Sequence, residues 1–197
     1  MTKKSIITIA IVAVLAIWGI SKYNGLVAVD EDTNRAWANV EAAYQSRADL
    51  IPNLVKTVKA YAAHESETFQ AVVEARAKAT SINLSVDSLT EQNMEQYRKM
   101  QDDLYNEMKS YLPRLIAISE SYPELKANEN FLKLQDQLEG QENRVRVERI
   151  NFNEAVQKYN VEVRSFPGNI VAMITGFGRR DEFKAEAGAE KAPQVEF

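Results

Sequence analysis

The chain has 197 residues, of which 45% are hydrophobic and 26% charged, a composition typical of one globular domain with or without an appendage. Its 24 lysines and arginines stand against 28 aspartates and glutamates, so the net charge is −4 and nucleic acid is disfavoured as a partner. The absence of cysteine and the single histidine exclude disulfides, thiol catalysis and cysteine zinc sites, and they leave little for histidine chemistry.

The first predicted element is a transmembrane anchor at residues 1–22. Residues 6–20 carry no charge, and lysines lie on both sides of them, at Lys3, Lys4 and Lys22. A spanning helix needs about 20 mainly apolar residues, and lysine side chains can extend a short run because their ammonium groups reach the interface. A cleaved signal peptide is the alternative, but the cleavage-site pattern is weak, which favours the anchor. Its large apolar residues are Ile6, Ile7, Ile9, Ile11, Val12, Val14, Leu15, Ile17, Trp18 and Ile20.

The charges around the anchor predict its orientation. Lys3, Lys4 and the amino group precede it, whereas Lys22 and Arg35 follow it. The positive-inside rule therefore leans towards a cytoplasmic N-terminus, with the bulk of the chain on the other side of the membrane.

Residues 23–183 show the spacing of long helices, and the tail at 184–197 is predicted to be disordered because it is poor in apolar residues. The first helix has an apolar or small face in steps of three and four: Leu26, Val29, Thr33, Trp37, Val40 and Tyr44. Pro52 interrupts the stretch that follows, and Asp49 is placed to cap a new helix in which proline falls in the first turn. A kinked continuous helix is the alternative.

A polar loop at residues 81–90 precedes a third helix over 88–120, with Asp87 or Ser88 as its cap. The fourth helix has a heptad pattern, which is typical of coiled-coil packing: Phe131, Leu138, Val145, Phe152, Tyr159 and Phe166. Pro167 and Gly168 end it. The predicted fold class is therefore all-α, an antiparallel four-helix bundle of long helices preceded by the transmembrane helix.

A last apolar stretch at residues 170–177 is too short to span a bilayer. It can dock on the bundle, or it can lie at a membrane surface with Arg179 and Arg180 towards the headgroups. Docking is favoured because apolar residues beside a core usually belong to it.

No catalytic, cofactor-binding or metal-binding residues are predicted. A zinc motif around His64 would need a second histidine at position 68, which is Thr68. A di-iron site would need glutamate three residues before that histidine, where the chain has Tyr61. Glycine-rich phosphate loops and nucleophile elbows do not occur in the sequence either.

Four charged residues are candidates for a polar network between helices: Arg47, Arg76, Glu142 and Arg149. Glu142 and Arg149 stand seven residues apart beside the apolar seam, where a buried charge must be paired. Ordinary exposed ion pairs are the alternative. Asn153 and Asn160 share the same spacing, and exposed amides are the favoured interpretation for them over hydrogen bonds across helices.

Several stretches resemble the LemA family of small bacterial membrane-anchored helical proteins. They are RADLIPNLVKTVKAYAAHE at 47–65, VVEARAKA at 72–79, SYPELKANENFLKLQDQLEGQENRV at 121–145 and RINFNEAVQKYNVEVRSFPGNIVA at 149–172. Tyr23-Asn24 and the apolar N-terminus add to the match, and Phe152-Asn153 stands where a Tyr-Asn pair is typical. The resemblance implies a four-helix bundle on one membrane anchor in the inner membrane, and it implies no catalytic site.

The leading hypothesis for function is a non-enzymatic adaptor or scaffold of the bacterial cell envelope. Its predicted partners are membrane lipid, through the N-terminal helix, and a second copy or another membrane protein. Nucleic acid, small-molecule substrates and cofactors are not predicted partners. The alternative is an envelope-stress or membrane-remodelling factor whose segment 170–177 engages lipid.

Overall fold

The structure is a computed structural model of the whole chain, and it describes residues 3–59, 89–121 and 129–184, with 70, 73, 74, 76, 77, 80, 81 and 84 between them. The helices with described bounds are α1 (Lys3–Lys59), α3 (Glu91–Ser121), α5 (Glu129–Arg164) and α6 (Gly168–Thr175). The prediction of an all-α protein with a long apolar N-terminal helix is therefore confirmed for the described part of the chain.

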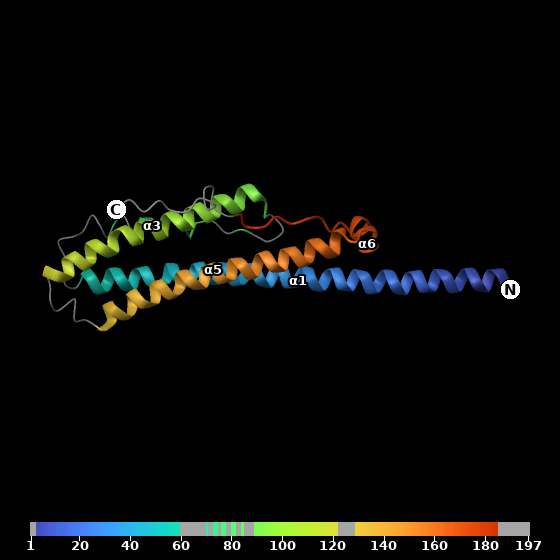
Figure 1. Cartoon of the computed structure of the whole chain (residues 1–197), viewed down its shortest axis with the longest axis horizontal. Helices are drawn as coiled ribbons and strands as arrows, with labels where there is room; N and C mark the ends of the chain where they lie inside the picture. The colour runs from blue at the N-terminus through green and yellow to red at the C-terminus, as the bar shows by residue number, and fades with distance from the viewer. Residues whose placement is uncertain are drawn as a thin grey trace, which may run out of the picture.

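The long helices lie side by side along the C-terminal part of α1 (Figure 1). α5 runs antiparallel to α1 and packs along it, whereas α3 runs in the same direction as α1 (Figure 1). We call residues 26–59 of α1, together with α3, α5 and α6, the helical body. The N-terminal part of α1 extends beyond this body on its own (Figure 1).

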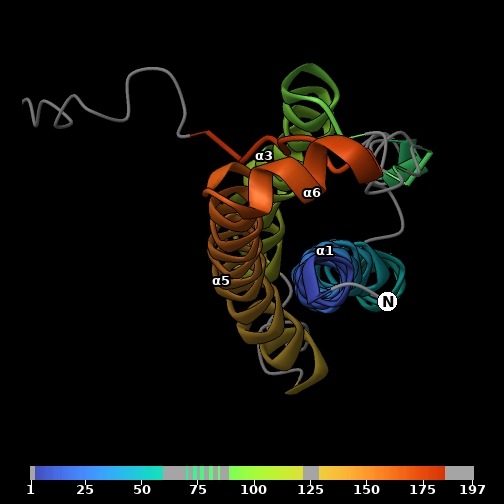
Figure 2. The same cartoon turned by 90° about the vertical axis from the view of Figure 1, so that its right-hand side faces the viewer.

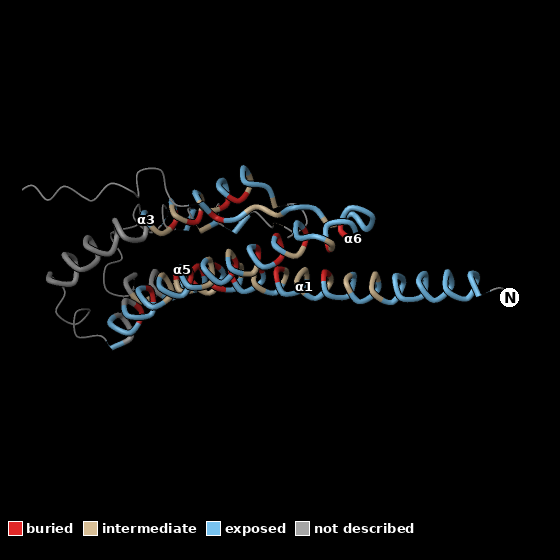
Figure 3. Tube along the Cα trace, turned by 45° about the vertical axis from the view of Figure 1, so that its right-hand side comes forward, coloured by how far each residue is buried: buried red, intermediate tan, exposed pale blue. Residues whose placement is uncertain are grey.

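That extension is the predicted anchor. Residues 3–17 are all exposed, as the pale blue end of the tube in Figure 3 shows. Of the helices that the structure describes, α1 is the one that is long and apolar enough to cross a membrane. Thr8 fits such a segment, because its hydroxyl donates a hydrogen bond to the carbonyl of Lys4 at 3.1 Å and does not depend on water.

α1 does not break at Pro52, so the predicted new helix with Asp49 as its cap is wrong and the continuous alternative holds. Proline has no N–H, which leaves the carbonyl of Ala48 without its usual helical donor. The Nε of Arg76 donates to that carbonyl at 3.1 Å. Asp49 instead accepts a hydrogen bond from Gln45 at 2.8 Å. A side chain from outside the helix thus satisfies the group that proline leaves unpaired.

The predicted inner face of α1 is confirmed. Leu26, Thr33, Val40 and Tyr44 are buried, and so is Trp37, which lies at the centre of a core cluster. The rings of Phe152, Tyr97 and Phe183 lie 5.3, 5.9 and 5.9 Å from that of Trp37. The indole N–H donates to the carbonyl of Leu84 at 3.1 Å, so this large side chain is buried without an unpaired donor.

The heptad pattern of α5 holds for the positions whose side chains are described within the helix. Leu138, Val145, Phe152 and Tyr159 are buried. The prediction is wrong for Phe166, which is 80% exposed, because α5 ends at Arg164 and the chain leaves the seam there. The side chain of Phe131 lies outside the described residues. The stretch after Pro52 continues the same spacing at Tyr61, Glu65, Phe69 and Val72, and these four residues also lie outside the described part.

α3 begins at Glu91, with Thr90 as its cap. The N–H of Asn93 donates to the hydroxyl of Thr90 at 3.3 Å, and the N–H of Thr90 donates to the amide oxygen of Asn93 at 2.7 Å. This reciprocal pair satisfies two donors at the start of the helix. The predicted caps, Asp87 and Ser88, lie outside the described residues.

Candidate functional site

Arg47 is the largest fully buried side chain among the described residues. Its Nη1 donates to a carboxylate oxygen of Glu142 at 2.9 Å. Its Nη2 donates to the backbone carbonyl of Gln101 at 2.6 Å and to the side-chain oxygen of the same residue at 3.2 Å. One guanidinium therefore connects α1, α3 and α5 at a single level of the helical body.

Aromatic rings complete the surroundings of this guanidinium. Its central carbon lies 5.1 Å from the ring centre of Tyr44 and 5.6 Å from that of Tyr105. Both contacts are within the range of a cation–π interaction, which is strongest where water is excluded. The arrangement neutralises one buried charge and holds three helices in register.

The other two members of the predicted network bind elsewhere. Arg76 caps the carbonyl of Ala48 and lies 3.4 Å from a carboxylate oxygen of Asp49. Arg149 places its guanidinium 5.0 Å from the ring centre of Phe183. Arg149 is seven residues from Glu142, about 10 Å along a helix, and both charges act on Tyr44, whose pKa burial raises, Arg149 lowers and Glu142 raises.

The chain after α6 forms an extended segment at residues 177–184, which we call the strap. Asn160 donates to the carbonyl of Arg180 at 2.8 Å and accepts from its N–H at 3.0 Å. Asn153 holds Phe183 in the same way, with two bonds of 2.9 Å. The interpretation of these asparagines as exposed amides is therefore wrong: each amide pairs with both backbone groups of one strap residue, as a neighbouring β-strand would.

Charged side chains tie the strap to the other helices. Arg180 lies 2.9 Å from a carboxylate oxygen of Asp30 and donates to the amide oxygen of Asn34 at 3.0 Å, both on α1. Asp181 accepts from the N–H of Glu91 at 3.1 Å, which stabilises the first turn of α3. Lys184 pairs with the carboxylate of Glu91. The strap thus contacts all of the long described helices.

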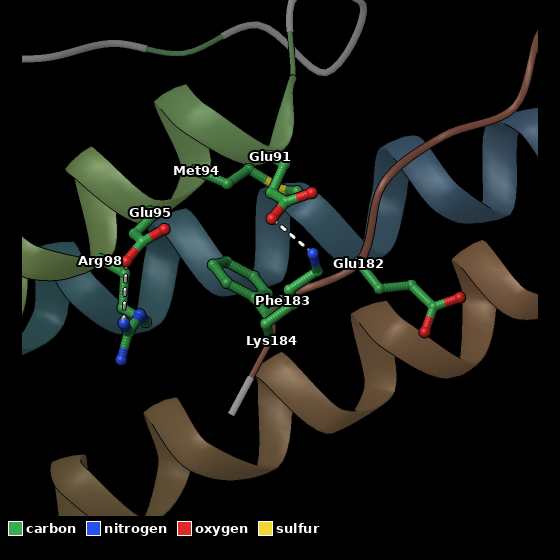
Figure 4. Close-up of a pocket in the computed structure, with 7 residues that line it drawn as sticks. All are labelled: Glu91, Met94, Glu95, Arg98, Glu182, Phe183 and Lys184. Carbon is green, nitrogen blue, oxygen red and sulfur yellow. Dashed lines mark hydrogen bonds and ion pairs between the residues drawn. The ribbon is translucent and has the colours of Figure 1, made fainter. Parts of the chain in front are cut away.

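The strap ends on a pocket of about 220 Å³ between α3 and the strap, and Figure 4 shows its lining side chains. They are Glu91, Met94, Glu95, Arg98, Glu182, Phe183 and Lys184. The charges of opposite sign are paired within the pocket or beside it: Arg98 lies 3.6 Å from Asp102 and 3.9 Å from Glu95. In the described part of the chain, no three histidines or carboxylates gather as metal ligands.

Burial of Tyr44 makes stability sensitive to alkaline pH. Desolvation raises the pKa of Tyr44 from 10.0 to about 12, against the opposing charges of Arg149 and Arg47. Unfolding then releases a proton that the folded state keeps, so the contribution of Tyr44 to stability is constant below pH 10 and falls by about 3 kcal/mol as the pH rises to 12. Burial also raises the pKa of Tyr97, which adds to the loss in the same direction. Urea unfolding across this range would measure the slope.

Tyr44→Phe is the matched control, because among the described residues the buried hydroxyl has no hydrogen-bond partner. The variant should be as stable as the wild type at pH 7 and should lose less stability between pH 10 and 12. An identical slope in both proteins would contradict the assignment.

α6 lies at the end of the helical body from which the N-terminal part of α1 leaves. The preference for docking of residues 170–177 is confirmed, since Ala172 is buried against Leu26, Tyr159 and Val163. Gly168 permits the approach of α6, because a Cβ there would lie 2.9 Å from the backbone oxygen of Glu162. The opposite face stays exposed.

Comparison with known proteins identifies the family of this chain. The LemA family model matches residues 36–197, which include α3, α5, α6 and the strap. The chain is also similar to magnetosome proteins MamQ 1 and MamQ 2 of Paramagnetospirillum magneticum, at 29% identity over 182 residues, 86% of this chain and 67% of each relative. MamQ of Magnetospirillum gryphiswaldense is 29% identical over 190 residues, 88% of this chain and 70% of the relative. The protein belongs to the LemA family and is distantly related to MamQ.

Proposed function

We propose that this protein is a non-enzymatic scaffold of the bacterial cell envelope, anchored by α1 in the inner membrane. The observation that carries the proposal is the continuity of α1 from an exposed apolar segment into the buried core around Trp37. A continuous helix transmits the position of the anchor to the helical body without a hinge.

The helical body is proposed to be an antiparallel four-helix bundle on the extracytoplasmic side. α1 and α3 run in the same direction and α5 runs against both, as alternate helices of an up-and-down bundle do. Because the chain lacks cysteine, a cysteine introduced at exposed Glu31 would report the side by its reaction with a membrane-impermeant reagent. Labelling only after the membrane is opened would contradict the proposed orientation.

A scaffold acts by binding copies of itself or another membrane protein. We expect the full-length chain, extracted from its own membranes in mild detergent, to have a mass well above its 22.3 kDa plus detergent. Mass photometry and the protein composition of the complex would measure this. A monomer that carries no other protein in stoichiometric amount would contradict the scaffold.

A second candidate function is membrane remodelling or envelope-stress response through lipid contact by residues 170–177. It is favoured by the exposure of Met173 and Ile174, at 77% and 76%. Full-length protein should then change the diameter of vesicles into which it is reconstituted, whereas a variant with serine at both positions should not. Equal diameters with both proteins would contradict remodelling.

A further inference from the structure

The orientation of α6 differs from that of the other described helices. Figure 2 looks towards the N-terminal end of the molecule, and there α1 is seen close to end-on while α6 lies across the view. In Figure 1, α6 lies beyond the end of α5, on the side towards which the anchor extends. If α1 stands across a membrane, α6 therefore runs parallel to the membrane surface.

The depth of α6 follows from its contacts with α1. Ala172 packs on Leu26, and the ring centre of Phe177 lies 6.0 Å from that of Tyr23. Leu26 follows Ile20, the last large apolar residue of the anchor, by six residues, which is about 9 Å along the helix. The headgroup layer begins where the anchor ends and is about 5–8 Å thick on each side. The Phe177–Tyr23 contact, about 4.5 Å beyond Ile20, falls within this layer, and α6 itself lies at its outer edge.

The residues of α6 are those expected of a helix at the headgroup layer and not of a helix surrounded by water. Its inner face is apolar at Ala172 and Val171. Its outer face is apolar as well, with Ile170, Met173 and Ile174 exposed at 43%, 77% and 76%. A helix that is apolar all round needs cover on both faces. The hydroxyl of Thr175 donates within the helix, to the carbonyl of Val171 at 2.7 Å.

We propose that α6 is an interfacial helix that lies flat in the headgroup layer of the membrane that α1 crosses, with Met173 and Ile174 towards the acyl chains. This inference rests on the proposed membrane anchor. Exposed Arg164 and Arg179 flank α6 on either side, where anionic headgroups would receive them. Interfacial helices bury their apolar faces about 5–10 Å into the boundary between headgroups and acyl chains, so the exposed side chains of α6 would have to reach inwards from the edge of that layer.

The consequence is an attachment at two points. A single spanning helix, even one that continues into the helical body, can itself tilt and rotate in the bilayer. A second contact, made by a helix that lies across the direction of the first, would set the height and the tilt of the helical body above the bilayer. The strap begins at Phe177, directly after α6, and its residue Arg180 is held by Asp30 of α1, so the same segment joins the interfacial helix to the core.

The test uses the full-length chain in vesicles of phosphatidylcholine and phosphatidylglycerol. Single cysteines at Ile11, Val147 and Met173 would carry the fluorophore NBD, and lipids brominated near the headgroup or deep in the chain would quench it. Val147 is the matched control, an exposed apolar residue on α5. We expect shallow lipids to quench Met173→Cys several-fold more than Val147→Cys, and deep lipids to quench Ile11→Cys.

Failure of the inference and failure of the anchor give different results. If Met173→Cys behaves like Val147→Cys while Ile11→Cys is quenched, α6 does not touch lipid and the proposed anchor stands. If Ile11→Cys is not quenched, both are overturned.

A charged residue beside the label tests whether the fluorophore itself, rather than α6, inserts into the membrane. Adding Ile174→Glu to the Met173→Cys protein should abolish its quenching, while Ile150→Glu, at another exposed isoleucine, should leave it. A melting temperature in detergent equal to that of the Met173→Cys protein would show that both variants fold. Quenching that persists with Ile174→Glu would overturn the inference.

Discussion

Replacing Arg47 with alanine is expected to lower the free energy of unfolding by about 3–5 kcal/mol, because the change removes a large, fully buried side chain and leaves the buried carbonyl of Gln101 without this donor, whereas the Glu142 side chain is 35% exposed. Arg47 is 0% exposed, and it supplies hydrogen bonds to Glu142 on α5 and to the backbone of Gln101 on α3. The variant also removes the largest fully buried side chain described in the molecule. Urea unfolding of the detergent-solubilised chain, followed by circular dichroism, would measure the loss.

Arg35→Ala is the control for this prediction. Arg35 pairs with Asp32 at 3.1 Å, yet its side chain is 71% exposed, so its loss should cost under about 1 kcal/mol. Glu142→Gln tests the charge alone, because glutamine keeps an acceptor near the guanidinium. The loss of unfolding free energy in Glu142→Gln should lie between the losses in Arg35→Ala and Arg47→Ala. If Arg47→Ala costs no more than Arg35→Ala, the buried pair does not stabilise the fold.

Replacing Phe183 with alanine should cost about 3–5 kcal/mol, as for other large aromatic side chains removed from cores. Phe183 is 8% exposed and lies in the core cluster formed by α1, α3 and α5. Its ring stacks on Trp37 at 5.9 Å, with 22° between the ring planes. The emission of Trp37 should therefore shift to longer wavelength when water enters the vacated space. Urea unfolding would measure the stability.

Phe166 provides a control of the same residue type in the same part of the chain. It is 80% exposed, so Phe166→Ala should change the free energy of unfolding by less than about 0.5 kcal/mol and leave the emission of Trp37 unchanged. Equal and small effects of the two changes would mean that the strap does not contribute to the core. A large effect of Phe183→Ala would make the strap an integral part of the fold.

Periodic patterns were a reliable guide wherever burial repeats along one helix. The face from Leu26 to Tyr44 on α1, and the heptad positions Leu138 to Tyr159 on α5, are buried as their spacing predicts. Side chains three, four and seven residues apart project from the same side of a helix, whatever the rest of the chain does. Local spacing therefore carries this information without knowledge of the partner helix.

Predictions about single residues failed where a distant segment supplies the missing partner. Pro52 predicts a break because the carbonyl of Ala48 loses its donor, but Arg76 provides another. Asn153 and Asn160 look like surface amides because nothing nearby pairs with them, yet the backbone of the strap does. Their spacing along the seam of α5 was the available signal. In each case the partner is 20 to 30 residues away in the sequence.

The sequence by itself determined the helical class, the apolar anchor and the faces that the helices bury, because these depend on spacing along one chain segment. Tertiary structure decided which charges meet: Arg47 binds Glu142 across 95 residues, while Arg149 contacts Phe183. It also decided that the strap packs into the core and that α6 lies at the end of the helical body from which the apolar part of α1 extends. Such contacts depend on the relative placement of whole helices, and no local pattern encodes that placement.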